Sequence, residues 1–143
     1  MDASVLVALA ALVLGTTALG LVIRARSGRV IIVTAVDDRP DARLAVAGAE
    51  VTLLLLTSPV CSACAVMRRV AEELVTDEPA VARHELDVTA HPELAREHNV
   101  LSTPTTLLVD ASGTVRGRIV GAAKPAEVRA AVQAVRESRA AAA

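Results

Sequence analysis

The segment Val51–Val70 reads VTLLLLTSPVCSACAVMRRV and contains the most informative pattern of the chain. It opens with Val51–Leu56, a continuous apolar run of the kind found in a central strand covered on both faces. Pro59 ends this run, and Cys61 and Cys64 then stand at the start of a helical pattern. The apolar positions at helical spacing are Val66, Val70, Leu74 and Val75. The segment therefore predicts a buried strand, a short turn and a helix that begins at a Cys-x-x-C pair.

Further strand and helix signals alternate on both sides of this segment. Runs of β-branched and apolar residues predict strands at Val30–Val36, Val81–Val88, Thr105–Val109 and Thr114–Val120. Helices are predicted from Pro92 to about His98 and from Pro125 onward, because proline suits the first helical position. This alternation favours a parallel sheet, and the turn signal at Asp110–Gly113 adds an antiparallel hairpin. The predicted fold class is α/β, a mixed sheet with helices on both faces.

An uncharged apolar run at residues 3–23 precedes these elements. A helix of about 20 apolar residues crosses the hydrocarbon core of a bilayer. A cleaved signal peptide carries positive charge before its apolar run, whereas this chain starts Met-Asp. We therefore predict a retained transmembrane anchor with its basic flank over 1–29, a globular domain over 30–139 and a frayed tail at 140–143.

The charges beside the apolar run bear on its orientation. Arg24, Arg26 and Arg29 follow the run, and basic residues next to a transmembrane helix favour the cytoplasmic side. We therefore predict a single-pass protein of the cell membrane whose domain faces the cytoplasm. An extracytoplasmic domain is the alternative.

The composition excludes several classes of function. The chain has 15 Lys and Arg against 16 Asp and Glu and contains no Phe, Tyr or Trp, so it lacks both the basic excess and the stacking rings of a nucleic-acid-binding protein. This bias is typical of a GC-rich bacterial genome, and aliphatic residues must fill the core. We find no phosphate loop and no dinucleotide fingerprint, so we expect no cofactor.

The Cys-x-x-C pair has a clear chemistry at the start of a helix. Unpaired backbone N–H groups and the helix dipole favour a thiolate at Cys61, and Cys64 lies one turn further along, within reach of a disulfide. We expect Cys61 to be the nucleophile and Cys64 the resolving thiol. Arg68 and Arg69 either support this thiolate or form a solvated helix face. The pair alone also allows two ordinary buried cysteines or half of a metal site.

A second motif sharpens this interpretation. Ser102–Thr105 reads STPT and lies at the start of a predicted strand, where a proline is often preceded by a cis bond. Together with TSPVCSAC at 57–64, Gly113 and Val120-Gly121, it resembles the thioredoxin superfamily over about residues 48–137. An anchor followed by such a domain resembles the membrane-tethered thioredoxin-like proteins of the TlpA type.

The resemblance implies a thioredoxin-like fold and thiol–disulfide oxidoreductase activity. It implies that Pro104 follows a cis bond and lies against the active-site disulfide. Thr103 would offer backbone groups to a bound substrate chain. Thr103, Pro104 and Val60 would then shape a substrate groove beside Cys61.

The sequence departs from the family pattern at several positions. Val60 stands where a Trp usually precedes the first cysteine, and Ser-Ala separates the cysteines. Leu55 stands where thioredoxins keep a buried carboxylate beneath the second cysteine. Glu85 falls where the family keeps a buried Lys, and a partly buried Glu85 with a raised pKa can accept the proton of Cys64. The alternative for Glu85 is a surface acid, solvated or paired with Arg83.

The leading hypothesis is a membrane-anchored thiol–disulfide oxidoreductase that works as a reductase, because the dipeptide between its cysteines is not of an oxidant type. Its partners would be a disulfide-containing protein or small thiol substrate and an electron-donating thiol. Two alternatives stay open. Cys61, Cys64 and Met67 can bind Cu(I), since soft sulfur ligands select it. The chain can also be a non-catalytic adaptor in a membrane complex.

Two weaker patterns, a series of three histidines and a pair of alternating arginines, are explained by structure and not by a functional site. His84, His91 and His98 recur every seven residues, but the last two would lie about 10 Å apart along a helix. We expect these histidines to be solvated and expect no metal site. Arg116 and Arg118 alternate with apolar residues, which predicts an edge strand with its charges outward.

Overall fold

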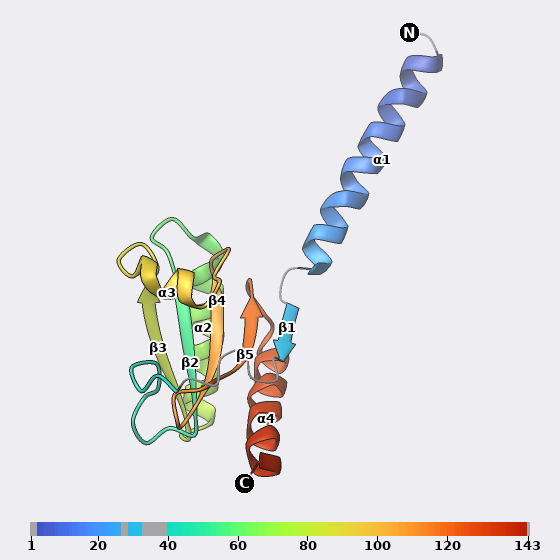
Figure 1. The fold of residues 1–143 in the computed structure, drawn as a ribbon. Coiled ribbons are helices and arrows are strands. Elements are labelled where there is room, and N and C mark those ends of the chain that lie inside the picture. The colour runs from blue at the N-terminus through green and yellow to red at the C-terminus, as the bar shows by residue number, and fades with distance from the viewer. Residues whose placement is uncertain (1–2, 27–28, 33–39, 143) are drawn as a thin grey trace.

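The computed structural model describes residues 3–26, 29–32 and 40–142 (Figure 1). In chain order the elements are α1 (Ala3–Arg26), β1 (Arg29–Ile32), β2 (Val51–Thr57), α2 (Ser62–Asp77), β3 (Val81–Asp87), α3 (Pro92–Glu97), β4 (Thr105–Asp110), β5 (Val115–Val120) and α4 (Pro125–Ala142). The predicted alternation of strands and helices is confirmed. The strand expected at Val30–Val36 is seen as far as Ile32, and its remainder lies outside the described residues.

The strands form one mixed sheet in the order β1-β5-β4-β2-β3. β2 pairs in parallel with β3, whereas β2 with β4, β4 with β5 and β5 with β1 are antiparallel. Every residue of β2 is buried. A strand with neighbours on both edges and helices on both faces has no solvated side, which explains its continuous apolar run.

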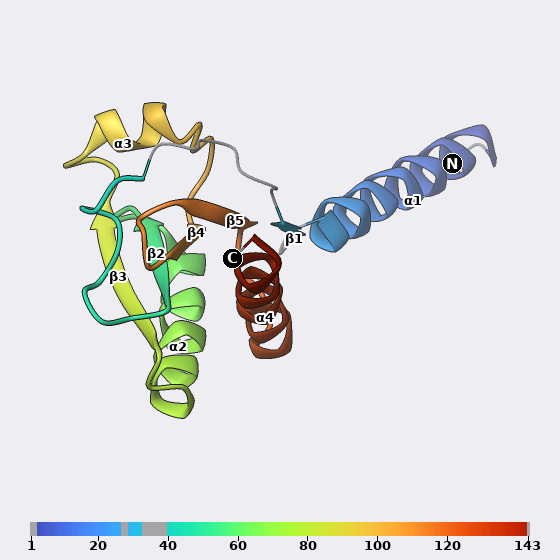
Figure 2. The same cartoon turned by 60° about the horizontal axis from the view of Figure 1, so that its bottom comes forward.

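Helices cover both faces of this sheet, as predicted. Figure 2 shows α3 on the opposite side of the sheet from α2 and α4. Alternate residues of β2 point to opposite faces. Leu53 and Leu55 therefore join the cluster beneath α2 and α4, and Leu54 and Leu56 join the cluster that contains Leu94 of α3.

The apolar face of α2 is turned differently from the expected one. Val66 is 54% exposed, whereas Met67 and Ala71 are fully buried. The buried residues of α2 are Cys64, Met67, Val70, Ala71 and Leu74. The helix thus docks through the face that carries Cys64. The predicted apolar positions were all larger aliphatic residues, so they did not include Cys64, Met67 and Ala71, which are buried on this face.

The prediction that Arg116 and Arg118 mark an edge strand is wrong. β5 lies between β1 and β4. Arg116 Nε instead donates a 2.8 Å hydrogen bond to Asp110 Oδ2. Arg118 donates to the backbone carbonyls at the end of α3. Arg116 thus pairs with the end of the neighbouring strand β4, and Arg118 binds the chain just after α3. An alternating sequence pattern cannot reveal either contact.

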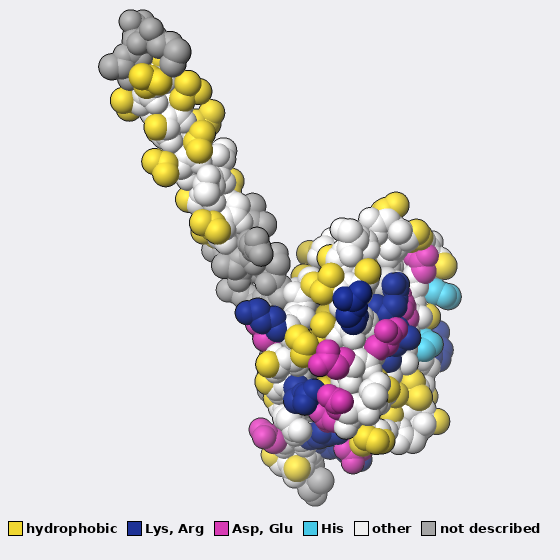
Figure 3. All heavy atoms as spheres, turned by 180° about the vertical axis from the view of Figure 1, so that it is seen from behind, with side chains coloured by type: hydrophobic (Ala, Val, Ile, Leu, Met, Phe, Trp, Pro, Cys, Tyr) yellow, Lys and Arg dark blue, Asp and Glu magenta, His cyan; other side chains and the backbone are white. Residues whose placement is uncertain are grey.

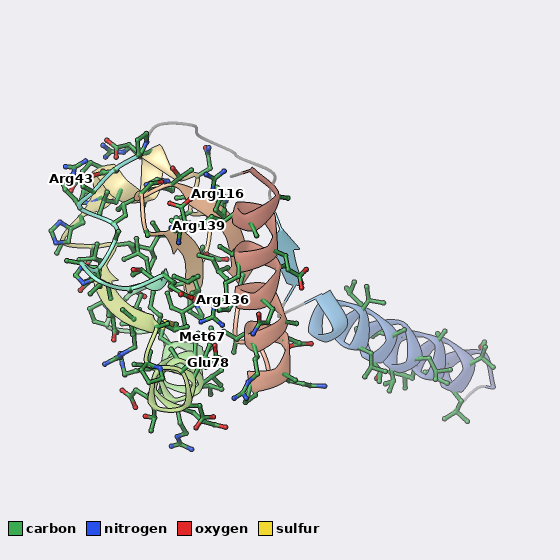
Figure 4. The ribbon with its side chains drawn as sticks, turned by 90° about the horizontal axis from the view of Figure 1, so that it is seen from below. Arg43, Met67, Glu78, Arg116, Arg136 and Arg139 are labelled. Carbon is green, nitrogen blue, oxygen red and sulfur yellow. A yellow bond between two sulfur atoms is a disulfide. The ribbon has the colours of Figure 1, made fainter. Side chains whose placement is uncertain are left out.

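The expected tail at 140–143 largely coincides with the last turn of α4. α4 continues through Ala142, and residue 143 lies outside the described residues. Alanine has the highest intrinsic helix propensity, so an alanine run extends a helix that is already formed. Arg136 holds this end of α4 to the rest of the domain through ion pairs with Glu78 at 2.7 Å and Glu50 at 3.2 Å (Figure 4).

α1 stands apart from the domain in Figures 1 and 2. Its segment Ser4–Val22 is long and apolar enough to cross a membrane, and none of it is buried. Figure 3 shows hydrophobic side chains along this helix, whereas charged side chains are spread over the domain. A membrane span and a signal sequence near an N-terminus share these properties.

Gly113 and Gly48 offer a matched test of the fold. Both have a left-handed backbone, with φ of 87° and 86°. A methyl group on Gly113 would come within 2.4 Å of the Asp41 carbonyl oxygen, whereas at Gly48 no atom of the described residues lies within 4 Å. We expect Gly48→Ala to lower the free energy of unfolding by about 1–2 kcal/mol from the left-handed φ alone.

We expect Gly113→Ala to cost clearly more, because the turn must also move away from Asp41. Denaturant titration of the full chain in detergent, followed by circular dichroism, measures both values. Equal losses for the two variants would show that the close approach to Asp41 does not constrain the turn.

Candidate functional site

The two cysteines lie where β2 gives way to α2. β2 ends at Thr57 and α2 begins at Ser62, with Cys61 in the N-cap position at φ −90° and ψ 101°. A disulfide joins Cys61 to Cys64, with an S–S distance of 2.05 Å and a Cα–Cα distance of 5.4 Å. The expectation that this pair lies within reach of a disulfide at a helix N-terminus is confirmed.

The two sulfurs have different surroundings. Cys64 is 2% exposed, whereas Cys61 is partly exposed. The backbone N–H of Cys64 donates a 3.1 Å hydrogen bond to Cys61 Sγ. Backbone N–H groups at the start of a helix stabilise negative charge on a sulfur. The arrangement therefore offers an accessible sulfur with a built-in donor and, one turn along, a shielded sulfur.

A polar hollow of about 420 Å³ lies beside Cys61. Its walls include the side chains of Arg68, Glu85 and Asp87. Arg68 lies on α2, and the two acids lie on β3. The hollow thus places charged groups from two elements next to the partly exposed cysteine.

Glu85 is held in this hollow by several donors. Arg68 Nη2 lies 2.7 Å from Glu85 Oε1, and Arg68 Nε lies 3.0 Å from Oε2. Arg83 Nη1 lies 3.2 Å from Oε2, and the hydroxyl of Thr57 donates to Oε1 at 3.1 Å. The carboxylate therefore has a full set of partners, of which Arg68 is the strongest.

The expectation of a raised pKa at Glu85 is wrong. The hydrogen bonds from Arg68 lower the pKa of Glu85 most, and they outweigh the opposing effect of partial burial. Thr57 and the charge of Arg83 lower this pKa further. The pairing with Arg83 that the sequence allowed is present, but Arg68 is the main partner. Arg68 lies on another element, so its position in the sequence does not reveal the contact.

The second motif lies beside the cysteine turn. The Thr103-Pro104 peptide bond is cis, as the resemblance implied. Ser58 Oγ and Thr103 Oγ1 share a 3.1 Å hydrogen bond that links the two loops. The N–H of Gly121 donates to the Pro104 carbonyl at 2.8 Å and secures the other side of this loop.

Two exposed apolar side chains flank the linked loops. Val60, which was predicted to shape the substrate groove, is 94% exposed. Leu101, which was not among the predicted site residues, is 96% exposed. Val60 immediately precedes Cys61, and Leu101 stands two residues before Thr103. The only sequence signal for Leu101 was its place just ahead of the STPT motif.

The remaining candidate metal ligands do not come together in a metal centre within the described residues. Met67 is fully buried on the side of α2 that faces the sheet, where it packs in the core (Figure 4). His84 lies on β3, and His91 and His98 bracket α3. Over residues 3–26, 29–32 and 40–142, no group of three or more His, Cys, Asp or Glu side chains is placed to hold a metal ion.

Comparisons with known proteins agree with this geometry. The sequence model of the thioredoxin-like domain family matches residues 40–136. The thioredoxin of Methanocaldococcus jannaschii is 33% identical over 60 residues, which are 41% of this chain and 71% of that protein.

Solved structures show the same likeness. Oxidised mitochondrial thioredoxin 3 from Saccharomyces cerevisiae matches with a TM-score of 0.53 and 25% identity, over 59% of this chain and 78% of that chain. Thioredoxin from Trypanosoma brucei brucei matches in fold with a TM-score of 0.53 and 21% identity, over 63% of this chain and 79% of that chain.

The ion pair of Glu85 predicts how stability depends on pH. A carboxylate whose pKa is lower in the folded chain than in the unfolded chain stabilises the fold above its ordinary pKa of 4.5. This stabilisation is lost as the pH falls through the lowered pKa. We expect Glu85→Gln to reduce the free energy of unfolding near pH 7, and the difference from the unmodified chain to vanish in acid.

Denaturant titrations between about pH 3 and pH 7 measure this difference. Glu73→Gln is the control, because Glu73 is an exposed carboxylate on the same helix as Arg68. A Glu85→Gln effect that stays constant over this range would contradict the ion pair.

Proposed function

Because the chain belongs to the thioredoxin-like domain family, we propose that it is a membrane-anchored thiol–disulfide oxidoreductase that works as a reductase. The observation that carries this proposal is the Cys61–Cys64 disulfide at the N-terminus of α2, with one sulfur accessible and the other shielded. The family match and the 33% identity to a thioredoxin support the same chemistry.

The proposed reaction begins with both cysteines reduced. The Cys61 thiolate attacks a substrate disulfide, forms a mixed disulfide with one substrate sulfur and releases the other as a thiolate. Cys64 then attacks Cys61 Sγ and releases the second substrate thiolate. The substrate gains two electrons, and the protein is left with the Cys61–Cys64 disulfide. An electron-donating thiol partner returns it to the dithiol.

Cys61 suits the first step because it accepts the N–H of Cys64. Arg68 adds a positive charge in the hollow beside Cys61. We assign Glu85 a positioning role, since its carboxylate holds Arg68 in this place through three hydrogen bonds. A carboxylate kept ionised by guanidinium groups is a poor proton acceptor, so we no longer assign it the proton of Cys64.

Thr103, Pro104 and Val60 form the substrate side of the proposed site. The Ser58–Thr103 hydrogen bond supports this assignment, because it keeps the STPT loop beside the cysteine turn. The exposed side chains of Val60 and Leu101 offer apolar contacts to a bound chain. A protein or peptide disulfide fits this surface better than a small charged thiol does.

The anchor places this chemistry at a membrane surface. Ser4–Val22 is the proposed span, and the arginines that follow it favour a domain on the cytoplasmic side. There a soluble thioredoxin system would supply electrons. On the opposite side, a membrane thiol carrier would have to do so.

Cysteine variants separate the two proposed roles. We expect Cys61→Ser to abolish reduction of a protein disulfide by the full chain in detergent, because no accessible nucleophile remains. Cys64→Ser should still attack and should accumulate as a mixed disulfide, because resolution fails. Gel mobility after alkylation of free thiols measures both outcomes.

Ser62→Ala is the control, since it leaves both sulfurs in place.

Equilibration of the unmodified chain in glutathione buffers should give a two-electron transition at about −250 mV or below, as expected for a reductase. Failure to form a disulfide at any potential would end the oxidoreductase proposal. Full cellular function of Cys61→Ser would point to an adaptor instead.

The two cysteines also report the side of the membrane. After mild reduction of intact producing cells, a membrane-impermeant maleimide should leave Cys61 unlabelled if the domain faces the cytoplasm. Labelling should appear once the cells are permeabilised. Labelling of intact cells would place the domain outside. Loss of residues 1–29 from the mature protein, seen by mass spectrometry, would show that α1 is a signal sequence.

A further inference from the structure

Thr106 is a buried polar residue to which the proposed reaction assigns no role. Its side chain is 0% exposed, and Thr106 Oγ1 has no hydrogen-bond partner within the described parts of the chain. A buried hydroxyl without a partner costs about 1–3 kcal/mol. A valine of nearly the same shape would avoid this cost, so the hydroxyl calls for an explanation.

The sheet register places this hydroxyl in a row of side chains. Thr106 of β4 pairs with Leu55 of β2 on one side and with Ile119 of β5 on the other. Leu55 in turn pairs with Glu85 of β3. Leu55 and Ile119 both belong to the core cluster beneath α2 and α4. Thr106 therefore points toward this helical layer, and polar residues flank Leu55 on both sides.

The same row lies near the start of α2. β2 leads into the cysteine turn, so Leu55 stands close to the end of the sheet at which α2 begins. Leu55 and Met67 share the core cluster. Cys64 lies one helical turn before Met67 on the same buried face. The first buried turn of α2 and the Thr106 hydroxyl thus occupy the same end of one apolar layer.

We propose that Thr106 is a positioning residue whose hydroxyl donates a hydrogen bond to the sulfur of Cys64 once the disulfide has opened. The proposal rests on the proposed thiol–disulfide exchange and adds the group that serves the resolving cysteine. In the disulfide, the sulfur is only a weak acceptor. In the reduced protein, the Cys64 thiolate is a strong acceptor, because hydrogen bonds to charged groups are stronger than those between neutral groups.

No proton is transferred to or from Thr106 in this scheme. The hydroxyl keeps its proton and donates the hydrogen bond while Cys64 is a thiolate. When Cys64 attacks Cys61 Sγ, the new S–S bond forms, the bond from Cys61 to the substrate sulfur breaks, and the hydrogen bond is released. The hydroxyl thereby raises the fraction of Cys64 that is ready to attack at neutral pH.

A two-phase reaction isolates this step. The reduced full chain in detergent is mixed with a nitrophenyl disulfide whose released thiol absorbs visible light. The first equivalent of thiol reports the attack by Cys61, and the second reports the attack by Cys64. We expect Thr106→Val to slow the second phase about tenfold near pH 7 and leave the first unchanged, because a charge-assisted hydrogen bond is lost.

The pH profile and a conservative variant distinguish this role from packing. The second phase of Thr106→Val should recover at alkaline pH, where Cys64 ionises without help. Thr106→Ser should keep the rate of the unmodified chain, because it keeps the hydroxyl. Denaturant titration of the oxidised proteins checks folding, and Thr106→Val should be no less stable, since it removes an unpartnered polar atom.

The outcomes separate the two proposals. If the unmodified chain releases no second equivalent, Cys64 does not resolve and the proposed function fails. If the unmodified chain shows both phases and Thr106→Val matches it at every pH, the role of Thr106 is overturned. Equal slowing by the Val and Ser variants would overturn it as well, because shape and not the hydroxyl would then matter.

Discussion

The backbone N–H groups at the start of α2 give the two cysteines their different roles, and the other parts of the site are arranged around them. They lie at the protein surface only because β2, buried along its whole length, delivers the chain to that point. Cys61 caps the helix and accepts the N–H of Cys64. The following turn carries Cys64 into the core. One helix start thereby creates two unlike sulfurs, which an exchange reaction with separate attack and resolution needs.

The polar groups around the cysteines are distributed in an unusual way. An aliphatic side chain, Leu55, occupies the central position of the row beneath α2. The carboxylate of Glu85 stands on one side of it and the hydroxyl of Thr106 on the other. The carboxylate reaches the edge of the sheet, where Arg68 keeps it ionised. Charge therefore gathers beside Cys61, and a neutral donor remains in the core.

The scaffold holds this site from two directions. The Ser58–Thr103 hydrogen bond ties the cysteine turn to the loop of the cis proline. At the far end of β2, Arg136 joins α4 to Glu50 and Glu78. Ion pairs of this kind contribute little stability individually when they are exposed, so most of the stability comes from the two apolar clusters. The site thus sits at one end of a core built without aromatic residues.

The order of strands and helices, the buried strand β2 and the cysteine pair at a helix start could be predicted from the amino-acid sequence, and the resemblance implied the cis bond before Pro104. Each of these rests on neighbouring residues, whose periodicity and turn chemistry are local. The pairing of Arg68 with Glu85, the interior position of β5 and the place of Thr106 beside Leu55 became visible only in the folded chain. These facts depend on which strands become neighbours and how a helix is turned on the sheet, and no short stretch of sequence encodes such long-range contacts.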